Sequence, residues 1–600
     1  MNCPSRTEPE IPEAWNQSPD ALNGDTTTRS DLGGIANARL QRDHRLRDQD
    51  AVEAELAEVQ TQDAGPTKPR SDMGGMAESV ETGGKMLDQT IGTDSTPSDS
   101  PTPPSTAPPK QPLHRRLLKI AKKYLHFIGP GFLISVAYID PGNYATDVAA
   151  GATYRFKLLF MILLSNLFAI FLQSLCIKLG TVTGLNLAEM CREHLPRWLN
   201  LLLYVLAEAA IVATDIAEVI GTAIALYLLS DGKIPLVAGC LISIVDVLFI
   251  LFFYRPSGAS MKALRAFEVG VMLLVIGVVI CFCFQLSLIS GPATSVSDVF
   301  NGYLPSRALV EGQGLYQACG ILGATVMPHS LYLGSGINQA RVKEFDEALR
   351  LGPSNELNDN ATTTARRLSL VSAYDEDTDA SKYRPSLQAI KSTLNYSIVE
   401  LSTTLFTFAL FVNSAILIVA GASLHNNPTA GTADLFSIYG LLSNSLAPAA
   451  GTVFALALLL SGTSAGIVCT IAGQMVSEGQ LRLRIKPWIR RLMTRSISIV
   501  PSIIVAGAVG KSGLGKALEG TQVVLSVILP FVSAPLLYFT CRRKFMTVSI
   551  GGDDGRNGNE EARTVSMKNH WVTVGFVVVV WGIIVVMNVA LLVLLGLGVG

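Results

Sequence analysis

The chain has few charged residues for its length. Of its 600 residues, 16% are Asp, Glu, Lys or Arg and 49% are hydrophobic, whereas a soluble globular protein carries about 25% charged residues. This shortage of charge excludes an ordinary soluble domain and predicts a polytopic membrane protein. The formal net charge is only -1, and no basic stretch is interleaved with aromatic residues, so we expect no nucleic-acid partner.

Other signatures are missing as well. The nine cysteines fall singly apart from Cys281 and Cys283, so the sequence indicates neither a zinc site nor a disulfide framework. The N-terminus has no apolar run of the signal-peptide type, and we therefore expect the first membrane span to direct insertion. Because there is no nucleotide-binding P-loop and no apparent aspartyl-phosphate site, we expect neither an enzyme nor a bound cofactor.

Polar segments divide the chain into regions. Residues 1–111 are rich in Pro, Ser, Thr, Asp and Gly, which predicts a disordered cytosolic tail. Residues 337–393 are predicted to form a disordered cytosolic loop, and residues 546–570 a cytosolic linker. The membrane spans would then occupy the remaining regions, which are 112–336 (the first five spans and the sixth), 394–545 (the seventh to tenth) and 571–600 (the eleventh).

Eleven apolar segments are long enough to cross a bilayer, although the ninth is short. They lie near residues 127–150, 156–180, 198–229, 234–254, 266–289, 313–336, 394–421, 448–475, 495–510, 519–540 and 571–597. Lys and Arg gather in the loops that face the cytosol if the N-terminus is cytosolic, and this bias predicts that orientation. The sequence leaves open whether this integral, multi-pass protein resides in the plasma, endosomal or vacuolar membrane.

The first apolar segment is interrupted by Asp140, Pro141, Gly142 and Asn143. A carboxylate at this depth costs about 2.5 to 3.5 kcal/mol and by default indicates an ion or substrate path. Proline cannot complete the helical hydrogen-bond ladder, so it frees backbone carbonyls, which are tolerated there only if they line a cavity or meet a ligand. Together these groups predict an oxygen-rich cation site; the alternative is a plain proline kink with a satisfied Asp.

A second interruption lies in the sixth segment, where Met327, Pro328 and His329 follow one another. Matched interruptions in two halves of a chain are the sequence sign of a binding site in an inverted-repeat transporter. The thioether of Met327 would favour Mn²⁺ and Fe²⁺ over Ca²⁺ and Mg²⁺, because sulfur is a soft ligand. Core packing is the alternative role for this methionine.

Asp-Pro-Gly-Asn at 140–143 and Met-Pro-His at 327–329 resemble the Nramp family of proton-coupled divalent metal transporters, and residues 327–334 resemble its fungal members. The resemblance covers about residues 112–545 and the final span. Further matches lie at 207–218, 463–478, 494–495, 521–526 and 529–531. The resemblance implies an all-α membrane protein of about eleven transmembrane helices with a LeuT-like 5+5 inverted repeat, in which helices 1 and 6 are broken at Pro141, Gly142 and Pro328.

The resemblance also implies the site residues. The expected metal ligands are Asp140, Asn143, the Ala324 carbonyl, Met327 and, in the occluded state, Gln522. The expected proton pathway comprises Asp140, His329, Asp215, Glu218 and Arg495. A buried Glu218–Arg495 pair of purely structural value and a satisfied core histidine at 329 are the alternatives. The sequence departs from the pattern at Gly334, where many family members carry a second histidine.

Independently of the resemblance, Glu208, Asp215 and Glu218 are spaced by seven and three residues and so share one face of the third span. Lone carboxylates cannot face lipid, and chains of acidic groups inside a bundle are typical of proton relays. We therefore expect this face to point into the protein.

The sequence as a whole predicts a secondary active transporter that imports divalent transition metal ions into the cytosol with protons. The expected substrates are Mn²⁺ and Fe²⁺, with Co²⁺, Cd²⁺ and Zn²⁺ as further candidates. A LeuT-fold symporter of an organic substrate and a membrane metal sensor are the alternatives.

The cytosolic tails are candidate sites of regulation by a kinase or a ubiquitin ligase. Arg366-Arg367-Leu368-Ser369 resembles a kinase site, but so short a match is common by chance. The sequon at Asn360 is expected to stay unglycosylated in a cytosolic loop.

Overall fold

The structure is a computed structural model that describes residues 129–243, 261–289, 295–311, 313–351, 383–425, 434–482, 487–508, 510–550 and 563–598. All of these belong to one of the two units into which the chain divides, Ala107–Gly600. The expected N-terminal tail, the second half of the fourth span, the middle of the loop with Asn360 and Ser369, and the side chain of Arg495 lie outside the described residues.

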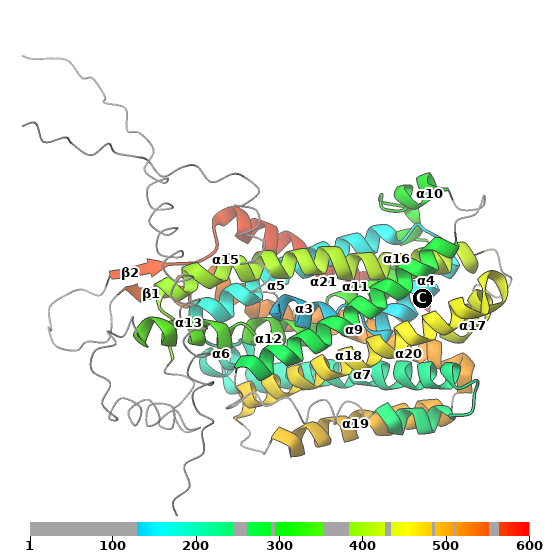
Figure 1. Cartoon of the computed structure of the whole chain (residues 1–600). Helices are drawn as coiled ribbons and strands as arrows, with labels where there is room; N and C mark the ends of the chain where they lie inside the picture. Colours follow the sequence, from blue (N-terminus) through cyan, green and yellow to red (C-terminus); the bar gives the residue numbers. More distant parts are fainter. Residues whose placement is uncertain are drawn as a thin grey trace, which may run out of the picture. The chain divides into compact units, whose positions relative to one another are not determined.

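Helices dominate the described residues (Figure 1). The first part of the chain forms α3 (Pro130–Val136), α4 (Pro141–Tyr154), α5 (Leu159–Thr183), α6 (Leu187–His194), α7 (Arg197–Leu229), α9 (Met261–Leu288), α10 (Val296–Asn301), the 3₁₀ turn η1 (Arg307–Leu309), α11 (Gly314–Thr325), α12 (Pro328–Gly336) and α13 (Gln339–Leu351). The second part forms α15 (Leu387–Thr404), the π-helical turn η3 (Leu405–Ala409), α16 (Leu410–Ser423), α17 (Leu435–Leu441), the π-helical turn η5 (Leu442–Leu446), α18 (Pro448–Leu481), α19 (Pro487–Ala508), α20 (Gly510–Cys541), β1 (Thr547–Ile550), β2 (Arg563–Ser566) and α21 (Trp571–Gly596).

Seven of the described helical segments are long and apolar enough to cross a membrane. They lie at Leu159–Thr183, Arg197–Leu229, Ala266–Leu288, Leu387–Ser423, Pro448–Leu481, Gly513–Cys541 and Trp571–Gly596. The other expected spans do not form one long helix among the described residues: the first and sixth are interrupted, the ninth is the short apolar helix Ser496–Ala508, and the fourth is described only in part. A mostly helical membrane protein with several apolar spans is therefore confirmed.

Burial separates the inner helices from the outer ones. In α7 and α18, 78% of the most apolar stretch is buried, against 33% in α9 and 28% in α21. Such apolar yet uncovered faces suit contact with lipid, because a soluble protein rarely exposes patches of that size. Figure 1 shows α18 beside α7 and α9, and α16 packs along α4, α11 along α20 and α12 along α5. The interrupted helices therefore lie within the bundle.

Two polar regions contain more regular structure than the sequence predicted. Helix α13 occupies residues 339–351 of the expected loop, and α15 already begins at Leu387, where Ser386 caps it by accepting from the Ala389 N–H. In the expected linker, β1 and β2 pair antiparallel with Val548 opposite Val565. Val548 is buried, and its burial supplies a packing reason for the hairpin that the polar composition of the linker conceals.

Candidate metal centre

The first helix break follows directly from the chemistry of Pro141. Helix α3 ends at Val136 and α4 begins at Pro141, which has no N–H to donate to the carbonyl of residue 137. Asp140 caps the new helix, since its Oδ2 accepts from the Gly142 N–H at 3.0 Å and its Oδ1 from the Asn143 N–H at 3.1 Å. Both N–H groups would bond to the carbonyls of Tyr138 and Ile139 in a continuous helix. The Asp140 side chain therefore replaces two backbone acceptors and leaves their oxygens for other partners.

Side chains of later helices take up these freed oxygens. The Ile139 carbonyl accepts from Ser461 Oγ of α18 at 2.7 Å, and the Tyr138 carbonyl accepts from Asn413 Nδ2 of α16 at 3.0 Å. Asn413 thus lies at the break, although the sequence analysis did not select it. Its only sequence signal is an amide within a long apolar span.

The second break obeys the same rule. Helix α11 ends at Thr325, the chain is extended at Met327, and α12 begins with Pro328. The Ala324 carbonyl would accept from residue 328 in a continuous helix, but proline offers no N–H. This oxygen is free to meet another group, as the sequence analysis expected.

Asn143 joins the two breaks. Its Nδ2 donates to Asp140 Oδ1 at 2.5 Å and to the Ala324 carbonyl at 3.0 Å, so an amide lies between a carboxylate of one break and a freed carbonyl of the other. Asp140, Asn143 and Ala324 are each 0% exposed. The structure therefore brings together three of the five expected metal ligands at a buried, oxygen-rich position.

Gln522 of α20 lies against the same place. A Cβ added to Gly142 would overlap the Gln522 side-chain amide and would lie 2.7 Å from Asp140 Oδ2. Gln522 Nε2 donates to Thr521 Oγ1, whereas its buried Oε1 has no hydrogen-bond partner among the described residues. The side-chain amide of Gln522 thus lies in the region of Asp140 with its oxygen unpartnered, and Gly142 is required there because a side chain would displace this amide.

Met327 is the N-cap of α12 and is 1% exposed. Its carbonyl accepts from Ser330 Oγ at 2.8 Å, which holds the start of α12 in place. The residue lies within the second break, three positions after Ala324. Its role as a sulfur ligand remains a prediction.

The residues expected to carry protons include His329 on α12 and Asp215 and Glu218 on α7. His329 Nδ1 lies 3.4 Å from Thr214 Oγ1, and Thr214 precedes Asp215. Asp215 accepts a hydrogen bond from Ser498 Oγ of α19, and oxygen atoms of Asp215 and Glu218 and the Cys469 thiol all lie within 4.8 Å of one another. The structure therefore gathers His329, Asp215 and Glu218 in one buried region.

Gly334 stands where the family pattern has a second histidine. A Cβ at this position would overlap Gln173 Oε1 and lie 3.5 Å from Cys176 Cβ, so any side chain there would require Gln173 of α5 to move. Gln173 Nε2 donates to the Ser330 carbonyl and to the Tyr138 hydroxyl, both at 2.9 Å. An amide of α5 thus links the two breaks, a role that the sequence analysis missed because only the fold brings these residues together.

The start of α3 is held by a buried ionic cluster. Glu400 Oε1 accepts from the Gly129 N–H at 2.7 Å and from the Gly131 N–H at 3.2 Å. Arg341 lies 3.2 Å from Glu268 and 3.9 Å from Glu400. A Cβ at Gly129 would overlap the Glu268 carboxylate, which accounts for glycine there. No role could be assigned to these acidic residues from the sequence, and the structure shows that they hold the N-terminal end of the first broken helix.

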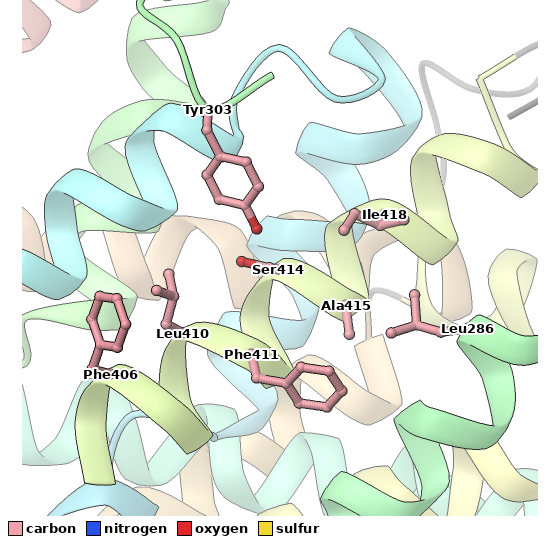
Figure 2. Close-up of a pocket in the computed structure, with 8 residues that line it drawn as sticks. All are labelled: Leu286, Tyr303, Phe406, Leu410, Phe411, Ser414, Ala415 and Ile418. Carbon is pink, nitrogen blue, oxygen red and sulfur yellow. The ribbon is translucent and has the colours of Figure 1, made fainter. Parts of the chain in front are cut away.

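A separate cavity of about 250 Å³ does not suit a cation. Figure 2 shows the Tyr303 and Ser414 hydroxyl groups pointing toward one another among apolar side chains. Its lining residues are Leu286, Tyr303, Phe406, Leu410, Phe411, Ser414, Ala415 and Ile418. Without a carboxylate, this cavity lacks the charge that a divalent ion requires.

A multi-pass membrane protein in which two interrupted helices meet at a buried set of oxygen atoms belongs, by its architecture, with the secondary transporters. Comparison with known proteins makes the class specific. A family model described as Natural resistance-associated macrophage protein-like, or Nramp, matches residues 131–550. The chain therefore belongs to the Nramp family.

Individual relatives agree with this assignment. The chain is 49% identical over 509 residues to the manganese transporter SMF1 of Saccharomyces cerevisiae, covering 80% of this chain and 87% of that protein. It is 53% identical over 435 residues to the iron transporter SMF3 of the same yeast, covering 72% and 85%. Among solved structures, the Eremococcus coleocola manganese transporter is similar with 30% identity and a TM-score of 0.60, covering 78% of this chain and 86% of that one.

Proposed function

We propose that this divalent metal transporter imports Mn²⁺ or Fe²⁺ into the cytosol together with protons. The observation that carries the proposal is the bridge made by Asn143, which joins the Asp140 carboxylate to the Ala324 carbonyl across the two helix breaks. Relatives named as manganese and iron transporters support the choice of metal. Family membership agrees with the prediction that the chain is not an enzyme.

The metal would take the place of the Asn143 N–H groups that lie between the Asp140 carboxylate and the Ala324 carbonyl. Asp140 would supply the negative charge, Asn143 its amide oxygen after rotation, and Ala324 its freed carbonyl. Met327 would add the soft sulfur that favours transition ions over Ca²⁺. Gln522 would close the coordination shell with its unpartnered oxygen.

Transport would follow from movement of the two broken helices against the other spans, in a LeuT-like arrangement of two inverted repeats of five spans each. The cluster of Glu400, Arg341 and Glu268 supports this view, because it fastens the N-terminal end of α3 at one point. Release of that end would open the path from the metal to the cytosol.

Protons would pass by a route beside the metal. Asp140 and His329 would start it, and Asp215, Glu218 and Arg495 would continue it toward the cytosol. The contact between His329 and Thr214 supports a connection to α7. The inside-negative potential would favour entry by about 2.3 kcal/mol per charge per 100 mV.

Uptake by purified protein in proteoliposomes tests the proposal. Mn²⁺ and Fe²⁺ should enter faster when the outside is acidic, Ca²⁺ and Mg²⁺ should not, and Co²⁺, Cd²⁺ and Zn²⁺ should compete. Binding of Mn²⁺ without any uptake would instead favour the membrane sensor. Uptake of an organic solute with no effect of metal would favour the organic symporter.

The membrane in which the protein resides is a separate question, which imaging can answer. We propose the plasma, endosomal or vacuolar membrane, with a cytosolic N-terminus whose tail and loops are available to a kinase or a ubiquitin ligase. Localisation of a tagged full-length chain would distinguish these membranes.

A further inference from the structure

The buried carboxylate of Asp147 has no assigned role. It is 0% exposed in α4, and neither of its oxygens has a hydrogen-bond partner among the described residues. Burying a carboxylate without a partner is strongly unfavourable, and inside a membrane such a residue indicates an ion path. A group of this kind therefore calls for a ligand that the protein itself does not provide.

The position of Asp147 on α4 links it to the metal centre. Asn143, Asp147 and Gly151 are spaced four residues apart and lie on one stripe of the helix. Asn143 Oδ1 accepts from Asn413 Nδ2 of α16 at 3.4 Å, and a Cβ at Gly151 would lie 2.6 Å from the Leu417 carbonyl of the same helix. Because both ends of the stripe touch α16, Asp147 lies against the turn between Asn413 and Leu417.

That turn offers a second oxygen atom. Asn413 Oδ1 is buried and has no hydrogen-bond partner among the described residues, while Asn413 Nδ2 is engaged with the Tyr138 carbonyl. The two amide donors are thus used at the break, and the amide oxygen is left. One carboxylate and one amide oxygen make a donor set that suits a hard or partly hydrated divalent cation.

Three helices around Asp147 supply no positive charge. Helix α4 and the helices α11 and α16, which pack against it, contain no Lys or Arg. Two further helices also pack against α4: α20 carries Lys511 and Lys516 in its first two turns, and α7 begins with an arginine. Arg155, at the C-terminal cap of α4, lies 3.7 Å from Asp298. It is eight residues beyond Asp147, a rise of about 12 Å along a helix. No residue of α4, α11 or α16 therefore supplies a counter-charge for Asp147.

We propose that Asp147 and the Asn413 amide oxygen form a second binding position for a divalent cation, outward of Asp140 along α4. The position rests on the proposed transport function and adds a step to it. The ion would be held there by oxygen atoms and water before it exchanges water for the ligands around Asp140. Because this outer position has no sulfur ligand, it would not discriminate between Mn²⁺ and Ca²⁺, and the inner centre alone would select against Ca²⁺.

Substitution of Asp147 tests the proposal in proteoliposomes. Asp147→Asn keeps the size and removes the charge, and we expect the KM for Mn²⁺ to rise about tenfold or more, since charge count sets the affinity of oxygen sites. The maximal rate at saturating Mn²⁺ should change by less than about twofold, because the inner ligands are intact. Ser165→Ala removes another buried polar group, a hydroxyl without a partner in the described residues; it is the matched control and should leave KM unchanged.

A second measurement guards against a folding defect. Asp147→Leu removes the buried carboxylate altogether, and its melting temperature in detergent should equal or exceed that of the wild type. Its KM for Mn²⁺ should nevertheless rise as in Asp147→Asn. An unchanged KM in both variants would overturn the outer position. If the pH dependence of uptake were lost while KM stayed unchanged, Asp147 would be a proton carrier and the outer position would be refuted as well. Absence of Mn²⁺ uptake by the wild type would refute the transport function instead.

Discussion

A single methyl group at Gly323 should push α11 away from α20, the helix that carries Gln522. Gly323 of α11 faces α20, and a Cβ there would overlap the Gln522 carbonyl and lie 2.6 Å from the Ser526 backbone nitrogen. Both obstacles are backbone atoms, so no side-chain rotation relieves them. Helices α11 and α20 would have to move apart by on the order of 1 Å.

Gly320, one turn earlier on the same helix, is the matched control. A Cβ at Gly320 would lie 3.3 Å from Thr146 Cγ2 and 3.8 Å from Val523 Cγ2, both ends of side chains that can shift slightly. Replacing glycine by alanine inside a helix stabilises it by roughly 0.5 to 1 kcal/mol. Gly320→Ala should therefore keep or raise the melting temperature.

Overpacking at Gly323 costs about 1 to 3 kcal/mol, which exceeds the helix gain. Because the displaced backbone belongs to Gln522, this cost should fall on the metal-bound, closed state. We expect the Kd for Mn²⁺, measured by calorimetry in detergent, to rise by roughly 5- to 150-fold in Gly323→Ala and by less than about twofold in Gly320→Ala. Equal affinities in the two variants would refute the claim that α20 closes over this centre.

Three further substitutions test separate parts of the site. Met327→Ala should keep Mn²⁺ uptake but allow Ca²⁺ to compete, because it removes the soft ligand; competition uptake measures this, and unchanged selectivity would remove the role of the sulfur. Glu218→Gln should weaken the pH dependence of uptake more than the Kd for Mn²⁺, and the opposite order would favour a structural ion pair. Glu400→Gln should lower the free energy of unfolding by about 1.5 to 3 kcal/mol, as it weakens charged hydrogen bonds to α3; an unchanged melting temperature would argue against the ionic cluster.

The two helix breaks could be predicted from sequence because their cause is local. Pro141 and Pro328 lack an N–H, so the carbonyls four residues earlier lose their partners wherever the helices lie. Ala324 could be named for the same reason. That Asn143 reaches Ala324 is a fact of the fold; from the sequence, their proximity is an expectation based on the matched interruptions and on the resemblance to a family.

Other parts of the site depend on residues far apart in the chain. Gln173, Asn413 and Glu400 each sit in an apolar span, where nothing in the neighbouring sequence tells which backbone atom they will meet. Helix α13 and the hairpin of β1 and β2 were missed for a related reason, since polar composition alone suggested a loop and a linker. Their packing against the bundle supplies the stabilisation that the local sequence does not.

The position of a bound ion tests the account most directly. X-ray crystallography of the full chain with Mn²⁺, using anomalous scattering to locate the metal, should place an ion about 2 to 2.5 Å from both an Asp140 oxygen and the Ala324 carbonyl. The same density should vanish in Asp140→Asn. Bound manganese with no ion at Asp140 and Ala324, and with Asn143 still bridging the two breaks, would contradict the proposed centre.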